Sequence, residues 1–179
     1  MTSSLFYSVE IDIICIVVFI CVIVNLWKSG DRVRYSYILL LFLVTLQAVT
    51  DALLKTYTSI SCYALFPKNE VCTKDVTEIV LLSCILSFFN LLVPYVLFVK
   101  SYLLKAEKSR TKGVKLCLYS VPFIILSYFI ITSPANGYIQ FLTYHGAYVH
   151  GRYYSALVAG VGFYSILALV NFMYVVASR

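Results

Sequence analysis

Three polar residues follow one another at four-residue intervals inside an otherwise apolar stretch of this chain. They are Gln47, Asp51 and Lys55, and this spacing places all three on one face of an α-helix. An acid followed four residues later by a base forms a favourable helical ion pair. Because ionisable groups are costly inside a membrane, each needs a partner or a role. The pattern predicts either a satisfied Asp51–Lys55 pair near a membrane surface or an outward-open pocket with Asp51 in its wall.

A second group of polar and aromatic residues lies in the segment 133–152, which is neither apolar enough to span a membrane nor polar enough for a loose loop. Its runs 138–143 and 147–150 favour strands and flank His145-Gly146, which predicts a short β-hairpin. Tyrosine suits a surface with one apolar and one wet side. We therefore expect the hairpin to cover the outer mouth of a helix bundle. We interpret its two histidines as exposed turn residues.

Together these two groups define the ligand-binding pocket that the sequence favours. A ligand would bind between the hairpin and the outer ends of the helices, and would act by binding one of two packing states more tightly. The candidate contacts are Asp51, Tyr138, Tyr144, Tyr148 and Arg152.

Five long apolar segments must position these residues. Each is close to the roughly 20 residues that an α-helix needs to cross a hydrocarbon core. Hydrophobic residues make up 61% of the chain and charged residues 12%, against about 25% charged in soluble domains. We expect an all-α integral membrane protein that forms a single polytopic domain over residues 1–179. The expected spans are 11–27, 35–54, 79–99, 116–132 and 154–177.

The basic residues concentrate in alternate loops, which predicts an orientation. By the positive-inside rule the N-terminus is extracellular and the C-terminus cytoplasmic, in a multi-pass protein of the cell membrane. The group from Lys100 to Lys115 is interpreted first as a topology anchor, with attraction of anionic lipid headgroups as the alternative. The inner-side bases are Lys28, Arg32, Arg34, Lys100, Lys105, Lys108, Arg110, Lys112, Lys115 and Arg179.

Several residues have a predicted structural role. Pro94 removes the helical partner of the Asn90 carbonyl and should kink the third span, either as a signalling hinge or merely to shape the bundle. Ala156 and Gly160 form a small-x-x-x-small pair that permits close helix packing within the chain, or else dimerisation. Pro134 and Asn136-Gly137 are expected to end the fourth helix.

Cysteine and histidine give no catalytic or metal signature. Cys62 and Cys72 share one outer loop, where they form a disulfide or remain two free thiols. No Cys/His spacing is typical of a zinc site, the apolar segments contain no histidine, and no phosphate-cradling Gly-rich loop is present. We therefore expect no enzymatic activity, no metal, no cofactor and no nucleic-acid partner.

The order of these features resembles the N-terminal membrane sensor module of Firmicutes-type signalling proteins, which precedes a diguanylate cyclase (GGDEF) or histidine kinase domain. Three places carry the resemblance. They are the acid in Thr50-Asp51-Ala-Leu-Leu, the stretch Asn90-Leu-Leu-Val-Pro94-Tyr95 with Tyr102 beyond it, and the outer hairpin with Gly137, Gly146 and Gly151.

The hairpin departs from the family pattern, because His150 stands where the family has Arg, Arg152 is shifted by two residues, and the acid of the first strand is missing. The resemblance implies a sensory membrane module whose output domain would follow it. This chain reaches Arg179 without such a domain, so we expect a truncated product or a fragment. Its ligand is unidentified, and its partners would be the bilayer and either a second copy or a signalling protein. The alternative is a small transporter or a transporter subunit.

Overall fold

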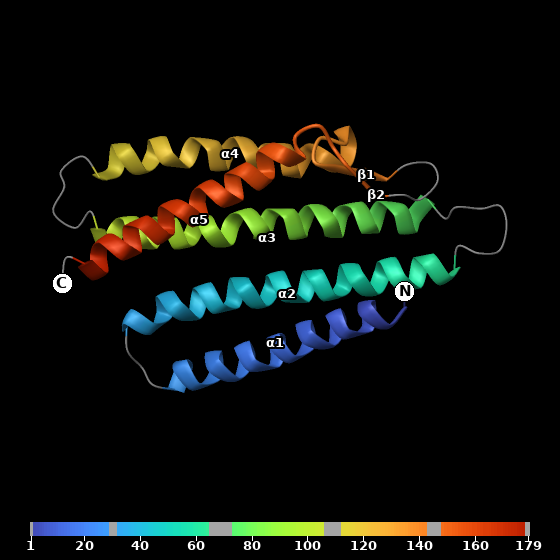
Figure 1. Cartoon of the computed structure of the whole chain (residues 1–179), viewed down its shortest axis with the longest axis horizontal. Helices are drawn as coiled ribbons and strands as arrows, with labels where there is room; N and C mark the ends of the chain where they lie inside the picture. Colours follow the sequence, from blue (N-terminus) through green and yellow to red (C-terminus); the bar gives the residue numbers. More distant parts are fainter. Residues whose placement is uncertain (1, 29–31, 65–72, 106–111, 143–147, 178–179) are drawn as a thin grey trace. The chain divides into compact units, whose positions relative to one another are not determined.

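The structure is a computed structural model that describes residues 2–28, 32–64, 73–105, 112–142 and 148–177. Five helices and two short strands make up this part of the chain (Figure 1). The elements are α1 (Thr2–Lys28), α2 (Arg32–Ala64), α3 (Thr73–Lys105), α4 (Lys112–Asn136), β1 (Gln140–Leu142), β2 (Tyr148–His150) and α5 (Tyr154–Ala177).

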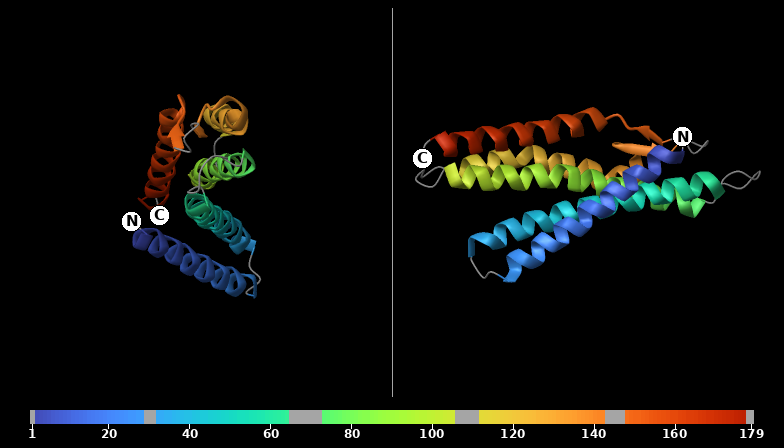
Figure 2. Two further views of the ribbon diagram at one scale, coloured as in Figure 1. Left: turned by 90° about the vertical axis from the view of Figure 1, so that its right-hand side faces the viewer. Right: turned by 60° about the horizontal axis from the view of Figure 1, so that its bottom comes forward.

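The chain divides into two compact units, Met1–Phe89 and Asn90–Arg179, and the boundary falls inside α3. In the first unit, α1 and α2 run side by side in opposite directions (Figures 1 and 2). In the second unit, the latter part of α3 packs with α4 and α5, and the two strands lie between the last two helices in sequence.

Within the described residues, four helical stretches have the length and composition of membrane spans. Large apolar side chains remain exposed along them, with Leu118 and Ile131 each 70% exposed, a surface that is favourable against hydrocarbon and costly in water. At 1.5 Å per residue, stretches of 20 to 27 residues extend roughly 30–40 Å. They are Tyr37–Thr56, Ile79–Lys105, Gly113–Asn136 and Tyr154–Ala177. Helix α1 is not among the four, so a fifth span stays a prediction.

The helices begin and end at different residues from those that the apolar segments predict. Helix α2 continues past residue 54 to Ala64 and α3 past residue 99 to Lys105, whereas α5 has the expected bounds. Apolar composition marks the part of a helix that contacts lipid. Backbone hydrogen bonding extends beyond it, because helix ends can continue into the headgroup region and water.

Several serine and threonine hydroxyls within the apolar helices bond to the backbone of their own helix. The Thr45 and Thr50 hydroxyls donate to the carbonyls of Leu41 and Leu46, at 2.7 and 2.8 Å. Ser87 likewise donates to the carbonyl of the residue four positions earlier, at 2.8 Å. In hydrocarbon an unsatisfied hydroxyl is costly, so these bonds let polar side chains remain in the spans.

The end of α4 corrects one expectation. Pro134 does not end the helix, since it lies within α4, which continues to Asn136. A proline in the last turn removes only one N–H, and the helix ends at Asn136, where Asn136-Gly137 predicted its end. Gly137 has φ 64°, and its N–H donates to the Ser133 carbonyl at 2.7 Å. Such a left-handed glycine cap is a common way to end a helix.

Helix α3 continues through Pro94, which is buried, without a break in its helical assignment. The boundary between the two units, at Phe89 and Asn90, lies one helical turn before this proline. A hinge at this place stays a prediction.

Candidate functional site

A charged triad connects the first two helices. The Lys55 ammonium lies 2.6 Å from Asp51 Oδ2, one turn earlier on α2, and 2.7 Å from Asp12 Oδ2 on α1. Lys55 Nζ donates a hydrogen bond to Asp12. The expected pair between Asp51 and Lys55 is therefore present, and a second carboxylate from another helix completes it.

The triad holds one more negative charge than positive. Its side chains are 18% (Asp12), 26% (Lys55) and 33% (Asp51) exposed, and Asp51 and Lys55 belong to the candidate span Tyr37–Thr56. Ion pairs in a membrane are stabilised when each charge has a close partner of opposite sign. Here two carboxylates share one ammonium, so the group retains capacity to accept a further donor or cation.

Asp12 is the residue of this site that the sequence interpretation missed. A usable signal was nevertheless present, since Ile11 and Ile13 flank it inside a helix-length apolar run. Only the packing of α1 against α2 assigns it to Lys55.

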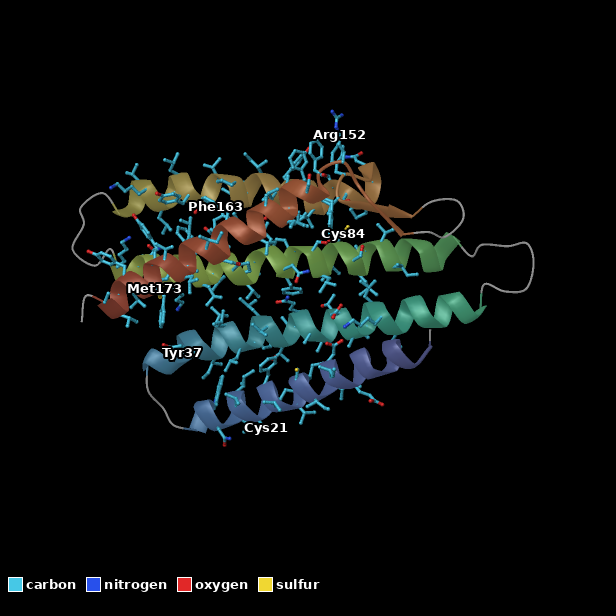
Figure 3. The ribbon with its side chains drawn as sticks, viewed as in Figure 1. Cys21, Tyr37, Cys84, Arg152, Phe163 and Met173 are labelled. Carbon is cyan, nitrogen blue, oxygen red and sulfur yellow. The ribbon has the colours of Figure 1, made fainter. Side chains whose placement is uncertain are left out.

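The other predicted contacts fall in the second unit or outside the described residues. Tyr138 packs edge-on against Phe129 and Tyr153, with ring centroids 5.7 and 5.5 Å apart. Arg152 is exposed and points away from the helices of its unit (Figure 3). Tyr144 lies outside the described residues, and Tyr148 lies in β2 with its side chain undescribed. A pocket that joins these residues to Asp51 stays a prediction.

The insert after α4 is fixed to its own unit by backbone bonds. Strands β1 and β2 pair antiparallel, with Phe141 opposite Val149, and they fall inside the two runs expected to favour strands. The Gly151 N–H donates to the Ile139 carbonyl at 2.7 Å. Residues 143–147, including the expected turn, lie outside the described residues, so the complete outer hairpin stays a prediction.

Gly151 and Gly160 lie at close contacts, with backbone atoms at Gly151 and with the end of a side chain at Gly160. A Cβ at Gly151 would collide with the backbone oxygens of Gly137 and Tyr138, and one at Gly160 would collide with the end of the Leu126 side chain. Gly160 therefore packs against α4 within the chain, as the small-residue pair indicated. Gly137 caps helix α4, and Gly151 allows two backbone segments to approach closely.

An aromatic cluster forms the core of the second unit. The Tyr164 ring is fully buried, and its hydroxyl donates to the Tyr119 carbonyl at 2.8 Å. Tyr95 stacks on Phe123 with centroids 4.0 Å apart and shares a 2.7 Å hydrogen bond with the Ser120 hydroxyl. Since these hydroxyls bond within the protein, the cluster is a packing core. It was not anticipated, because aromatic spacing alone does not show which rings face inward.

The described residues contain no group of three His, Cys, Asp or Glu side chains that could hold a metal ion. Cys15, Cys21 and Cys117 are free thiols, and Cys84 is buried. Cys72 and the side chain of Cys62 lie outside the described part of the chain, so their disulfide alternative stays open.

No family model, curated protein or solved structure matches this chain. The resemblance to bacterial sensor modules therefore rests on the sequence motifs alone.

Proposed function

We propose that this chain is the ligand-sensing membrane module of a bacterial signal-transduction protein, without catalytic activity of its own. The observation that carries the proposal is the triad of Asp12, Lys55 and Asp51. An ionisable cluster inside a membrane span is a functional candidate by default, because its insertion is costly unless it has a use.

The excess carboxylate defines the class of ligand. A cation, a protonated amine or a proton itself would neutralise the negative charge that Lys55 leaves uncompensated. Asp12 lies on α1, whereas its partner lies on α2. A ligand that takes one carboxylate away from Lys55 therefore favours a different packing of the two helices, and the signal is the free-energy difference between the two arrangements.

The proposed topology places this input on the outer side. Helix α1 serves as the fifth span, the N-terminus lies outside and the C-terminus inside, as the distribution of bases favours. The strands β1 and β2 then belong to an outer insert. Asp12, in the N-terminal half of α1, and Lys55, near the end of the candidate span Tyr37–Thr56, would both lie toward the outer surface.

Trp27 is the only tryptophan of the chain, and it supplies the test. It is 68% exposed near the end of α1 that is remote from Asp12, so its fluorescence reports a shift of that helix. In lipid nanodiscs, titration with spermidine or Mg²⁺ should change the Trp27 emission saturably. Replacing Asp12 or Asp51 by Asn should abolish the response.

Glu10→Gln is the matched control. It removes an equal charge from an exposed position two residues from Asp12 and should leave the response unchanged. A response that persists in both Asp→Asn variants would refute the triad as the input.

The transporter alternative has one observation in its favour. Helix α3 carries buried Ser83 and Ser87 in the two turns before Asn90 and Pro94, and polar groups inside a span are typical of transport sites. Substrate uptake into proteoliposomes that contain this chain alone would favour this second function over the sensor.

A further inference from the structure

The charge of this chain is divided unevenly between its two units. Residues 1–89 contain six Lys or Arg and seven Asp or Glu, whereas residues 90–179 contain eight Lys or Arg and a single acid, Glu107. The whole net charge of +6 therefore originates in the second unit. A charge imbalance of this kind indicates an anionic partner.

Three bases of this unit whose side chains are described lie at one end of its helices. Lys100 and Lys105 lie in the last turns of α3, and Lys115 lies in the first turn of α4. Figure 1 shows these two helix ends close to the C-terminal end of α5. Lys105 and Lys115 are exposed and Lys100 is half-buried. Arg152 lies apart from them, where the insert meets α5.

One of these lysines is held in place by two side chains of α5. The Lys105 ammonium donates to Asn171 Oδ1 at 3.2 Å and lies 4.6 Å from the centre of the Tyr174 ring. Asn171 is only 6% exposed. Neither contact neutralises the charge, and an ammonium has three N–H donors. Lys105 therefore presents a fixed positive charge at the end of the helices.

We propose that this end of the second unit binds anionic phospholipid headgroups, with Lys100, Lys105 and Lys115 as the cationic contacts. The three lysines lie near the ends of the candidate spans Ile79–Lys105 and Gly113–Asn136, where their ammonium groups can reach the headgroups. Exposed Tyr119 and Tyr174 are beside them, as is common for aromatic rings at a membrane interface. Each lysine near an anionic surface contributes about fivefold to binding.

Quenching of tryptophan fluorescence by brominated lipids next to the site tests the proposal. Leu104, which is 56% exposed beside Lys105, is replaced by Trp in a Trp27→Phe background. Brominated phosphatidylglycerol should then quench this Trp several-fold more effectively than brominated phosphatidylcholine in mixed nanodiscs.

The K100Q/K115Q variant leaves the Lys105–Asn171 contact intact. Its preference for phosphatidylglycerol should fall about fivefold for each lysine removed. Raising the salt concentration should weaken the preference by screening.

Two controls separate this site from general effects. K100R/K115R keeps the charge and should retain the preference, and R152Q removes a base elsewhere in the unit and should not change it. An unchanged preference in K100Q/K115Q would overturn the proposal. So would loss of the preference in millimolar glycerol phosphate, because the site would then bind a soluble anion.

Discussion

At the residue scale, the informative feature is the unequal charge of the triad. Lys55 is indispensable because it compensates two carboxylates, whereas either Asp can be lost and still leave one neutral pair. In a membrane segment this difference is large, because an unpaired buried charge is far more costly than a lost hydrogen bond.

We therefore expect Lys55→Gln to destabilise the protein by up to about 3 kcal/mol, the low end of the cost of breaking a fully buried pair, because the triad is only partly buried. Asp12→Asn and Asp51→Asn should cost about 1 kcal/mol each, the size of one hydrogen bond. Thermal unfolding in nanodiscs measures all three. Equal losses for Lys55 and the two acids would show that the excess carboxylate has no energetic consequence.

A triple variant tests the same explanation for the cost of losing Lys55. Lys55→Gln combined with Asp12→Asn and Asp51→Asn removes every charge of the triad, and it should be less destabilising than Lys55→Gln alone, because no buried charge is left without a partner.

At the element scale, the close packing of α5 against α4 depends on a single glycine. Gly160 faces Leu126, whereas Gly162, two residues further along the same helix, has open space around its Cα. Both positions are therefore glycines of α5, and they differ in whether an added Cβ would meet another side chain.

We expect Gly160→Ala to destabilise the second unit by roughly 1–3 kcal/mol, because the added methyl group forces Leu126 out of place. Gly162→Ala should be neutral or stabilising by up to about 1 kcal/mol, through the better helix propensity of alanine. Thermal unfolding of the two single variants measures the difference. If Gly160→Ala is as well tolerated as Gly162→Ala, the helices do not pack closely at this point.

At the scale of the whole molecule, the distribution of charge predicts how the helices are oriented in a membrane. Lys115 near the start of α4 and Arg152 just before α5 are on opposite ends of α4, whose apolar stretch Gly113–Asn136 has the length of a span. The positive-inside rule assigns the Lys115 end to the cytoplasm.

In a variant without native cysteines, a membrane-impermeant maleimide should label Arg152→Cys and not Lys115→Cys in intact cells. Inverted vesicles should give the reverse result. Labelling of both positions in intact cells would show that α4 does not span the membrane, and the reverse pattern would show that the proposed orientation is wrong.

The sequence by itself determined the class of the molecule, the approximate places of its helices and the pair between Asp51 and Lys55. These follow from composition, apolar length and a four-residue spacing, all of which are local properties of the chain. The helix ends were less predictable, because hydrogen bonding continues beyond the apolar part of a segment. Pro134 did not end α4, because the helix continues to Asn136 and is capped by the left-handed Gly137.

Only the tertiary structure assigned Asp12 to Lys55, Asn171 to Lys105 and Gly160 to Leu126. In each case the partners are distant in sequence, so their contact depends on which faces of two helices meet. In a chain that is apolar on nearly every face, hydrophobic periodicity does not mark the inward side. Which faces point inward was decided by side-chain packing and by the few polar groups that pair between helices.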